Sequence, residues 1–108
     1  MAYDISLEAR IDSLTVDWEL TKQELFGGLG YFLESTMCFA IRGDELLLRL
    51  DYAKVHGLLK KPGVHTAEMG ARTMKNWIQA GGDAIADDDD LKSLLVIGQD
   101  YATTHPKP

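Results

Sequence analysis

Apolar and polar residues alternate between residues 25 and 50, which predicts short antiparallel strands joined by tight turns. Residues 37–50 are the clearest part, because the two-residue turn Gly43-Asp44 sets the register of a hairpin. Three cross-strand pairs on one face are then wholly apolar: Met37 with Leu50, Phe39 with Leu48, and Ile41 with Leu46. We therefore predict that this side of the hairpin belongs to the core.

The opposite face of the same strands is also apolar. If Ser35-Thr36 forms a second two-residue turn, residues 29–33 return alongside the hairpin. The second face then carries Tyr31, Leu33, Cys38, Ala40 and Leu47. A face this apolar is normally covered, so we expect it to contact a partner. A one-residue bulge would instead exchange the faces of residues 29–33.

The remaining periodicities predict three helices and three more strands. They are a helix over Asp4–Leu14, a strand over Thr21–Phe26, a helix over Asp51–Lys61, strands over Val64–Met69 and Lys75–Ala80, and a helix to about Thr103. This order predicts an α+β fold, a two-layer sandwich in which helices cover an antiparallel sheet of five or six strands. At 108 residues, the whole chain (1–108) is expected to form one domain.

Gly27, Gly28 and Gly30 allow two interpretations. A phosphate-binding loop would need a Lys-Ser or Lys-Thr ending and a following helix. Here the glycines lead into another predicted strand, so a hairpin turn or bulge is favoured.

Four consecutive aspartates, residues 87–90, could bind calcium or magnesium. A calcium-binding EF-hand loop, however, needs alternating oxygen ligands, a central glycine and a final glutamate, and none of these follows. Acidic residues at a helix start cap free amides and complement the helix dipole, so we favour capping.

Few residues suggest catalysis. His56, His65 and His105 lack the spacing of metal ligands, and Cys38 is the only cysteine. A Cys38–His65 pair remains open at this stage, but nothing marks Cys38 as reactive. Trp18 is expected to be a lid on the core rather than a ligand platform. We expect no catalytic residue, no metal and no cofactor.

Composition narrows the function further. A net charge of −6 argues against direct nucleic-acid binding, because phosphate contacts need clustered Lys and Arg. The chain has no apolar run that would span a membrane and no secretion signal, so a cytoplasmic location is expected.

The charge is unevenly distributed along the chain. Residues 1–24 carry six acids and two bases, whereas residues 42–75 carry seven bases and four acids. The acidic ends could neutralise the basic middle within one molecule, or the basic middle could recognise an acidic partner. Arg42, Arg49 and Lys75 could also gather to hold an anion or a nucleotide.

Several motifs resemble the TfoX amino-terminal domain, a module of the TfoX/Sxy competence regulators. These are FGGLGYF at 26–32, MCFAIRGDELLLRL at 37–50, a Tyr-containing helix ending in Lys-Pro-Gly, RTMKNW at 72–77, and an Asp-rich start to a Leu-rich helix. The resemblance extends from Met1 to about Ala102. The positions expected to match the family, and our candidate binding residues, are Phe26, Gly27, Gly28, Arg42, Gly43, Arg49, Lys75 and Trp77.

The resemblance implies a secretion-chaperone-like α+β fold and a bacterial regulatory role. Full-length regulators of this type carry a second, helical domain and assist transcription of DNA-uptake genes beside a cyclic-AMP receptor protein. The chain stops at Pro108, so we expect that second domain to be absent. The leading hypothesis is a small non-enzymatic interaction module, expected to be a homodimer with a further protein partner. The alternative is a small anion- or nucleotide-binding domain.

Overall fold

A computed structural model describes residues 3–25, 27–69 and 72–105 of the chain. The elements, in order, are α1 (Ile5–Leu14), β1 (Thr21–Leu25), β2 (Gly28–Leu33), β3 (Thr36–Arg42), β4 (Glu45–Arg49), α2 (Tyr52–Leu59), β5 (Val64–Met69), β6 (Arg72–Ala80), η1 (Gly82–Ala84) and α3 (Asp88–Thr104). The predicted helices and strands are all present, and β6 begins three residues earlier than the sequence indicated. None of the helices in the described residues is long and apolar enough to cross a membrane.

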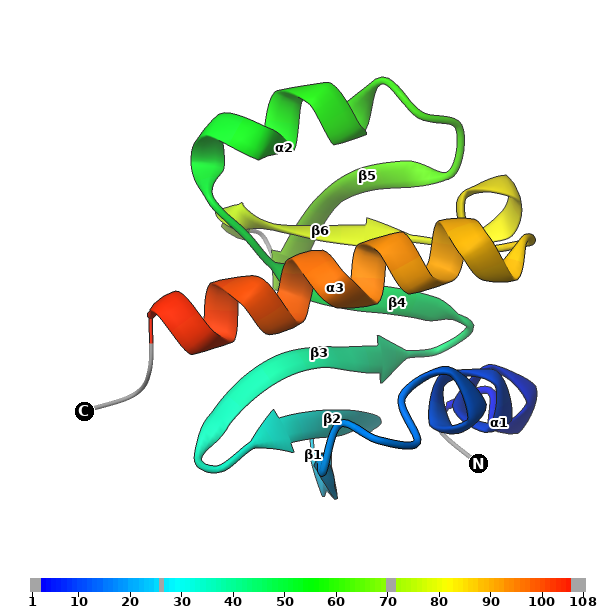
Figure 1. Cartoon of the computed structure of the whole chain (residues 1–108). Helices are drawn as coiled ribbons and strands as arrows, with labels where there is room; N and C mark the ends of the chain where they lie inside the picture. The colour runs from blue at the N-terminus through cyan, green and yellow to red at the C-terminus, as the bar shows by residue number, and fades with distance from the viewer. Residues whose placement is uncertain (1–2, 26, 70–71, 106–108) are drawn as a thin grey trace.

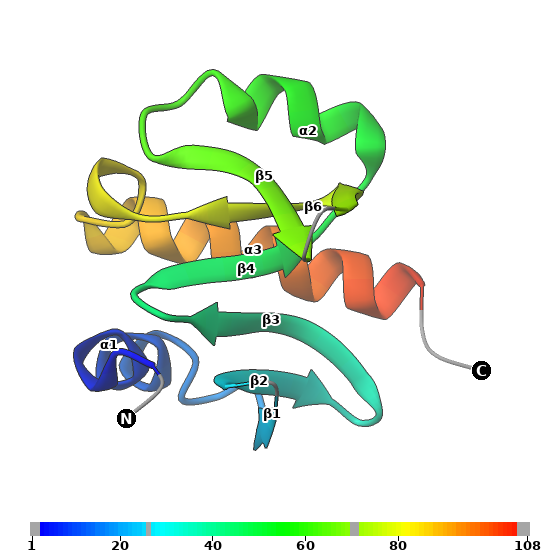
Figure 2. The same cartoon turned by 180° about the vertical axis from the view of Figure 1, so that it is seen from behind.

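The six strands form one antiparallel sheet in the order β1-β2-β3-β4-β6-β5. All three helices pack on the same face, and α3 lies across its middle (Figure 1). Seen from behind, the strands face the viewer and α3 lies beyond them (Figure 2). The predicted α+β architecture of two layers is therefore confirmed. In the part of the chain that the structure describes, one face of the sheet has no helix on it.

The register predicted for the β3–β4 hairpin is confirmed for its four pairs nearest the turn. Arg42 pairs with Glu45 and Ile41 with Leu46, up to the pair of Phe39 with Leu48. Gly43 has a φ of 66°, the left-handed conformation that this tight turn requires. The side chains of Phe39, Ile41, Leu46 and Leu48 are fully buried under the helices.

The faces assigned to β2 and to the start of β3 were wrong. The turn uses Glu34 and Ser35, so Phe32 pairs with Met37, but Tyr31 pairs with Phe39. Cys38 is therefore one extra residue, a β-bulge that turns two consecutive side chains, Cys38 and Phe39, into the same core.

The bulge exchanges side chains between the two faces. Tyr31 and Cys38, predicted on the open face, are buried under the helices, and Leu33 packs against the same core. Met37, predicted in that core, instead packs beside Ala40 on the open face. Ala40 and Leu47 lie on the open face as predicted.

The glycine pair is a turn that leads into a strand. Gly27 has a φ of 76°, and Gly28 is already paired with Leu25 in the β1–β2 ladder. A side chain at Gly28 would run into the carbonyl oxygen of Ile41. The hairpin interpretation of this segment is confirmed, with Gly27 in the turn and Gly28 already in β2. Phe26 lies outside the described residues.

Acidic caps start the first helix and, as predicted, the last one. The Asp4 carboxylate accepts from the backbone amide of Ser6 at 2.8 Å, and Asp87 accepts from that of Asp89 at 2.7 Å. Arg10 joins the two helices, because its Nη2 donates to the Ile85 carbonyl at 2.6 Å and to Asp88 at 2.9 Å. The aspartate run therefore starts and anchors α3.

α3 approaches the sheet closely at Gly98. A Cβ there would meet the carbonyl oxygen of Cys38 and would lie 3.3 Å from Cδ2 of Phe39. Trp18 closes the same region as a core lid, with its ring centroid 6.4 Å from that of Phe39. The absence of a side chain at residue 98 therefore sets the distance between helix and sheet.

We expect Gly98→Ala to lower the free energy of unfolding by about 1–3 kcal/mol, because the added methyl group forces α3 off the β3 backbone. The measurement is urea unfolding followed by circular dichroism.

Gly57→Ala is the matched control, since Gly57 is also helical but has no atom within 4 Å of an added Cβ. It should raise stability by about 0.5–1 kcal/mol through helix propensity alone. Equal effects at the two positions would contradict the close approach of α3.

Candidate functional site

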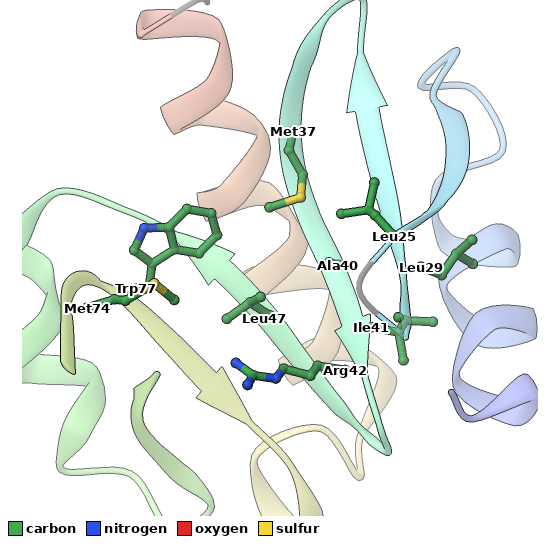
Figure 3. A pocket seen from close by; sticks show the side chains of 10 residues that line it. Leu25, Leu29, Met37, Ala40, Ile41, Arg42, Leu47, Met74 and Trp77 are labelled. Atoms are coloured by element: carbon green, nitrogen blue, oxygen red, sulfur yellow. The ribbon is translucent and has the colours of Figure 1, made fainter. Parts of the chain in front are cut away.

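The face of the sheet without helices holds an apolar groove of about 350 Å³, called here the back groove (Figure 3). It is lined by Leu25, Gly28, Leu29, Met37, Ala40, Ile41, Arg42, Leu47, Met74 and Trp77. Among the described residues, Arg42 is the only charged one in this lining. The groove thus runs from the turn end of the β1–β2 hairpin across the central strands to β6.

β5 and β6 bend over the sheet and form one wall of the back groove. The pairing shifts between Thr66, opposite Ile78, and Ala67, opposite Met74. The paired segments 67–69 and 72–74 beyond this irregularity are called the overhang, and the end of β5 crosses the strands in Figure 2. Ala67 is fully buried in a small apolar cluster with Ala40 and Leu47. The overhang is therefore packed onto the sheet.

A polar network also fastens the overhang. Nη1 of Arg42 donates to the backbone carbonyl of Glu68 at 2.8 Å and lies 3.4 Å from Oε1 of Gln79. Oε1 of Glu45 accepts from Nε2 of Gln79 at 2.9 Å and lies 2.8 Å from Nε2 of His65. This hydrogen bond to Glu45 is the main cause that raises the pKa of His65 above its usual value.

A second, basic hollow of about 610 Å³ adjoins the back groove and is called the basic cleft. It is lined by Arg49, Arg72, Thr73, Met74, Lys75, Asn76 and Trp77. The Arg49 guanidinium lies 6.0 Å from the ring centroid of Trp77 and 5.1 Å from that of Tyr101. These two aromatic rings hold Arg49 by cation–π contact.

The structure separates the three cations that the sequence grouped. Arg42 is beside the turn, opposite Glu45, whereas Arg49 lies at the far end of β4, opposite Trp77. Arg49 and Lys75 share the basic cleft, but Arg42 holds the overhang instead.

The other predicted residues play different parts. Trp77 lines both hollows, Gly28 lines the back groove, and Gly27 and Gly43 form turns. Arg72 was missed as a member of the basic cleft. Its place in the RTMK run, three residues before Lys75, is the sequence signal that could have found it.

A comparison with protein families matches residues 18–100 to the TfoX N-terminal domain. This match covers well over half of the chain, from Trp18 in the loop after α1 into the last helix. The chain belongs to the TfoX N-terminal domain family. The resemblance seen in the motifs is thereby confirmed, although α1 precedes the matched region.

At the level of the family, this TfoX N-terminal domain is a regulatory, competence-related domain. The family is not a known enzyme family. No curated protein and no solved structure matched the chain in the same comparisons.

The residues considered for catalysis do not come together in this TfoX N-terminal domain. Cys38 is buried under the helices, and burial raises the pKa of its thiol. His65 is exposed on β5 and is paired with Glu45, so the Cys38–His65 pair that the sequence left open is not formed. Within residues 3–25, 27–69 and 72–105, no group of three His, Cys, Asp or Glu side chains could hold a metal ion.

The His65–Glu45 pair should make stability depend on pH. Because the pKa of His65 is raised in the folded protein, the pair stabilises fully below the unfolded value of about 6.5. This contribution is lost as the pH rises through the folded pKa. An NMR titration of the His65 ring should give a pKa above 6.5.

Glu45→Gln is the partner variant for this titration, since it removes the charge and keeps the shape. It should bring the pKa of His65 back toward 6.5, with a flatter pH dependence of the unfolding midpoint. An unchanged His65 pKa in this variant would contradict the pairing.

Proposed function

We propose that this TfoX N-terminal domain is a cytoplasmic regulatory module without enzymatic activity, which acts through protein contacts made by the back groove. The observation that supports the proposal is an open hollow whose lining is apolar except for Arg42. Contiguous apolar surface of this kind on a folded protein marks contact sites. Through such contacts the domain would take part in the transcriptional regulation of competence genes.

The side chains at the rim of the back groove suit a protein contact. Met37, Met74 and Trp77 are half-buried, so part of each remains open to a partner. Methionine adapts its shape to a bound surface, and tryptophan is enriched among residues that dominate binding energy. By contrast, Leu47 is only 8% exposed and is packed with Ala40 and Ala67, so it supports the floor.

A homodimer is the simplest contact that this face supports. A second copy would cover the apolar lining that water otherwise meets. Two copies each carry a net charge of −6, which opposes their association over long distances and makes it sensitive to salt.

The second candidate function is that of a small anion- or nucleotide-binding domain. The basic cleft favours it, because Arg49, Arg72 and Lys75 line one hollow beside Trp77. Arg42 ends β3, opposite Glu45 at the other end of β4, and does not contribute to this hollow. The candidate therefore depends on the cleft alone.

At micromolar concentration we expect light scattering to give twice the chain mass of 12.0 kDa. Met37→Asp should weaken this association at least about thirtyfold, because it places an unpaired carboxylate in the apolar contact. Thermal unfolding of the variant checks that the monomer still folds.

Val16→Asp is the control, since Val16 is 78% exposed and lies outside the back groove. It adds the same charge and should leave the mass unchanged. A monomeric wild-type chain would remove the homodimer from the proposal, and equal effects of both variants would remove the back groove as its interface.

Nucleotides and phosphorylated metabolites test the second candidate in a thermal-shift screen. If the domain works only through protein contacts, millimolar concentrations of these anions should leave the unfolding midpoint unchanged. A midpoint that rises with ligand concentration, and no longer rises in Arg49→Gln, would favour the anion-binding function instead.

A further inference from the structure

We infer that the back groove and the basic cleft together bind an acidic segment of a partner protein, with an apolar side chain in the groove and carboxylates on the cleft. This inference rests on the proposed function, in which the back groove is a protein-contact surface. It adds the chemistry of the partner and a second region of contact.

The two hollows adjoin each other. Met74 and Trp77 line both, so a ligand that leaves the back groove past the indole of Trp77 enters the basic cleft. Figure 3 places Trp77 and Met37 at one end of the groove and Arg42 at the other. The cleft therefore extends the groove at the end away from Arg42.

The charged side chains that line this combined surface are all positive. Of the residues that the structure describes, the lining of the cleft contains Arg49, Arg72 and Lys75 and no acidic one. In the described ranges, the recorded ion pairs involve Arg10, Lys22, His65 and His105, and none uses a cation of the cleft. The three cations therefore favour carboxylates from outside the molecule.

Arg49 is already oriented for such a contact. Its guanidinium contacts the rings of Trp77 and Tyr101, and these contacts lower the entropy lost when it binds a carboxylate. A planar guanidinium can bind a carboxylate with two parallel hydrogen bonds. Arg72 and Lys75 are exposed and would add attraction that is screened by salt.

The shape of the groove leaves room for an inserted segment even where a second copy of this chain covers the open face. The groove lies between the overhang and the β1–β2 hairpin, so two identical open faces would leave these hollows unfilled. From Glu45 to Arg49, β4 rises by about 13 Å, which an extended segment of about four residues spans. A short acidic segment can therefore reach from the groove to the cleft.

The test uses NMR chemical shifts of the full chain, titrated with a capped peptide in which two leucines precede four aspartates. We expect saturable shifts at Met37, Leu47, Met74 and the Trp77 indole, and weaker binding as salt increases. No shift at millimolar peptide, or shifts away from these residues, would overturn the inference.

Two altered peptides separate this inference from the proposed function. Replacing the aspartates with asparagines should weaken binding about three- to tenfold, because ion pairs at an exposed cleft are individually modest. Replacing the leucines with serines should remove binding at the back groove. If the asparagine peptide binds equally well, the groove remains a contact surface, but the partner need not be acidic and this inference fails.

Matched protein variants complete the test. Arg72→Gln with Lys75→Gln should weaken binding of the acidic peptide and leave the asparagine peptide unaffected. Lys54→Gln with Lys60→Gln removes the same charge from exposed positions on and beside α2, outside both hollows, and should leave the affinity unchanged.

Two other occupants would overturn the inference. A stable dimer from which the acidic peptide is excluded would assign the groove to a second copy. Salt-sensitive retention of DNA in a gel-shift assay, without peptide binding, would assign the cleft to nucleic acid.

Discussion

The β-bulge at Cys38 determines how this domain is assembled. One extra residue turns Cys38 and Phe39 toward the helices, and the Cys38 carbonyl then faces Gly98 of α3. Only glycine allows this approach, because any Cβ would meet that oxygen. Without this contact, the long helix could not lie flat on the middle of the sheet. The bulge thus controls both the main core and the orientation of β2.

The same bulge creates the open face. Because Met37 turns away from the helices, it joins Ala40 and Leu47 on the side that no helix covers. A second irregularity, between Thr66 and Ala67, bends β5 and β6 over this side as the overhang. A straight sheet would present a flat apolar surface at this point. Two local departures from regular pairing make it concave instead.

Charge then distinguishes the two ends of the hollow surface. At one end, Arg42 is used internally, since it holds the overhang through the Glu68 carbonyl and Gln79. At the other, Arg49 is positioned by aromatic rings and lies in a lining with no acid. Under the proposed function, such asymmetry would favour one orientation of a bound acidic segment.

The sequence by itself determined the elements, their order and the register of the hairpin around Gly43. These features depend on interactions that are short in sequence, such as periodic burial, tight-turn chemistry and acidic caps. The motifs also determined the family. Only the tertiary structure decided which face of the sheet carries Tyr31 and Cys38. One bulge reverses the alternation of side chains between the two faces, and it leaves no mark in the composition of the sequence.

The basic cleft likewise depended on the fold. Arg49 and Lys75 were visible candidates, but the sequence also counted Arg42, which lies on β3 opposite Glu45, at the other end of β4 from Arg49. The bend of β5 and β6 brought Arg72 into the lining of the cleft, and pairing across a bend of this kind cannot be predicted from alternating residues. The sequence therefore determined which side chains were available, and the bulges decided which of them meet.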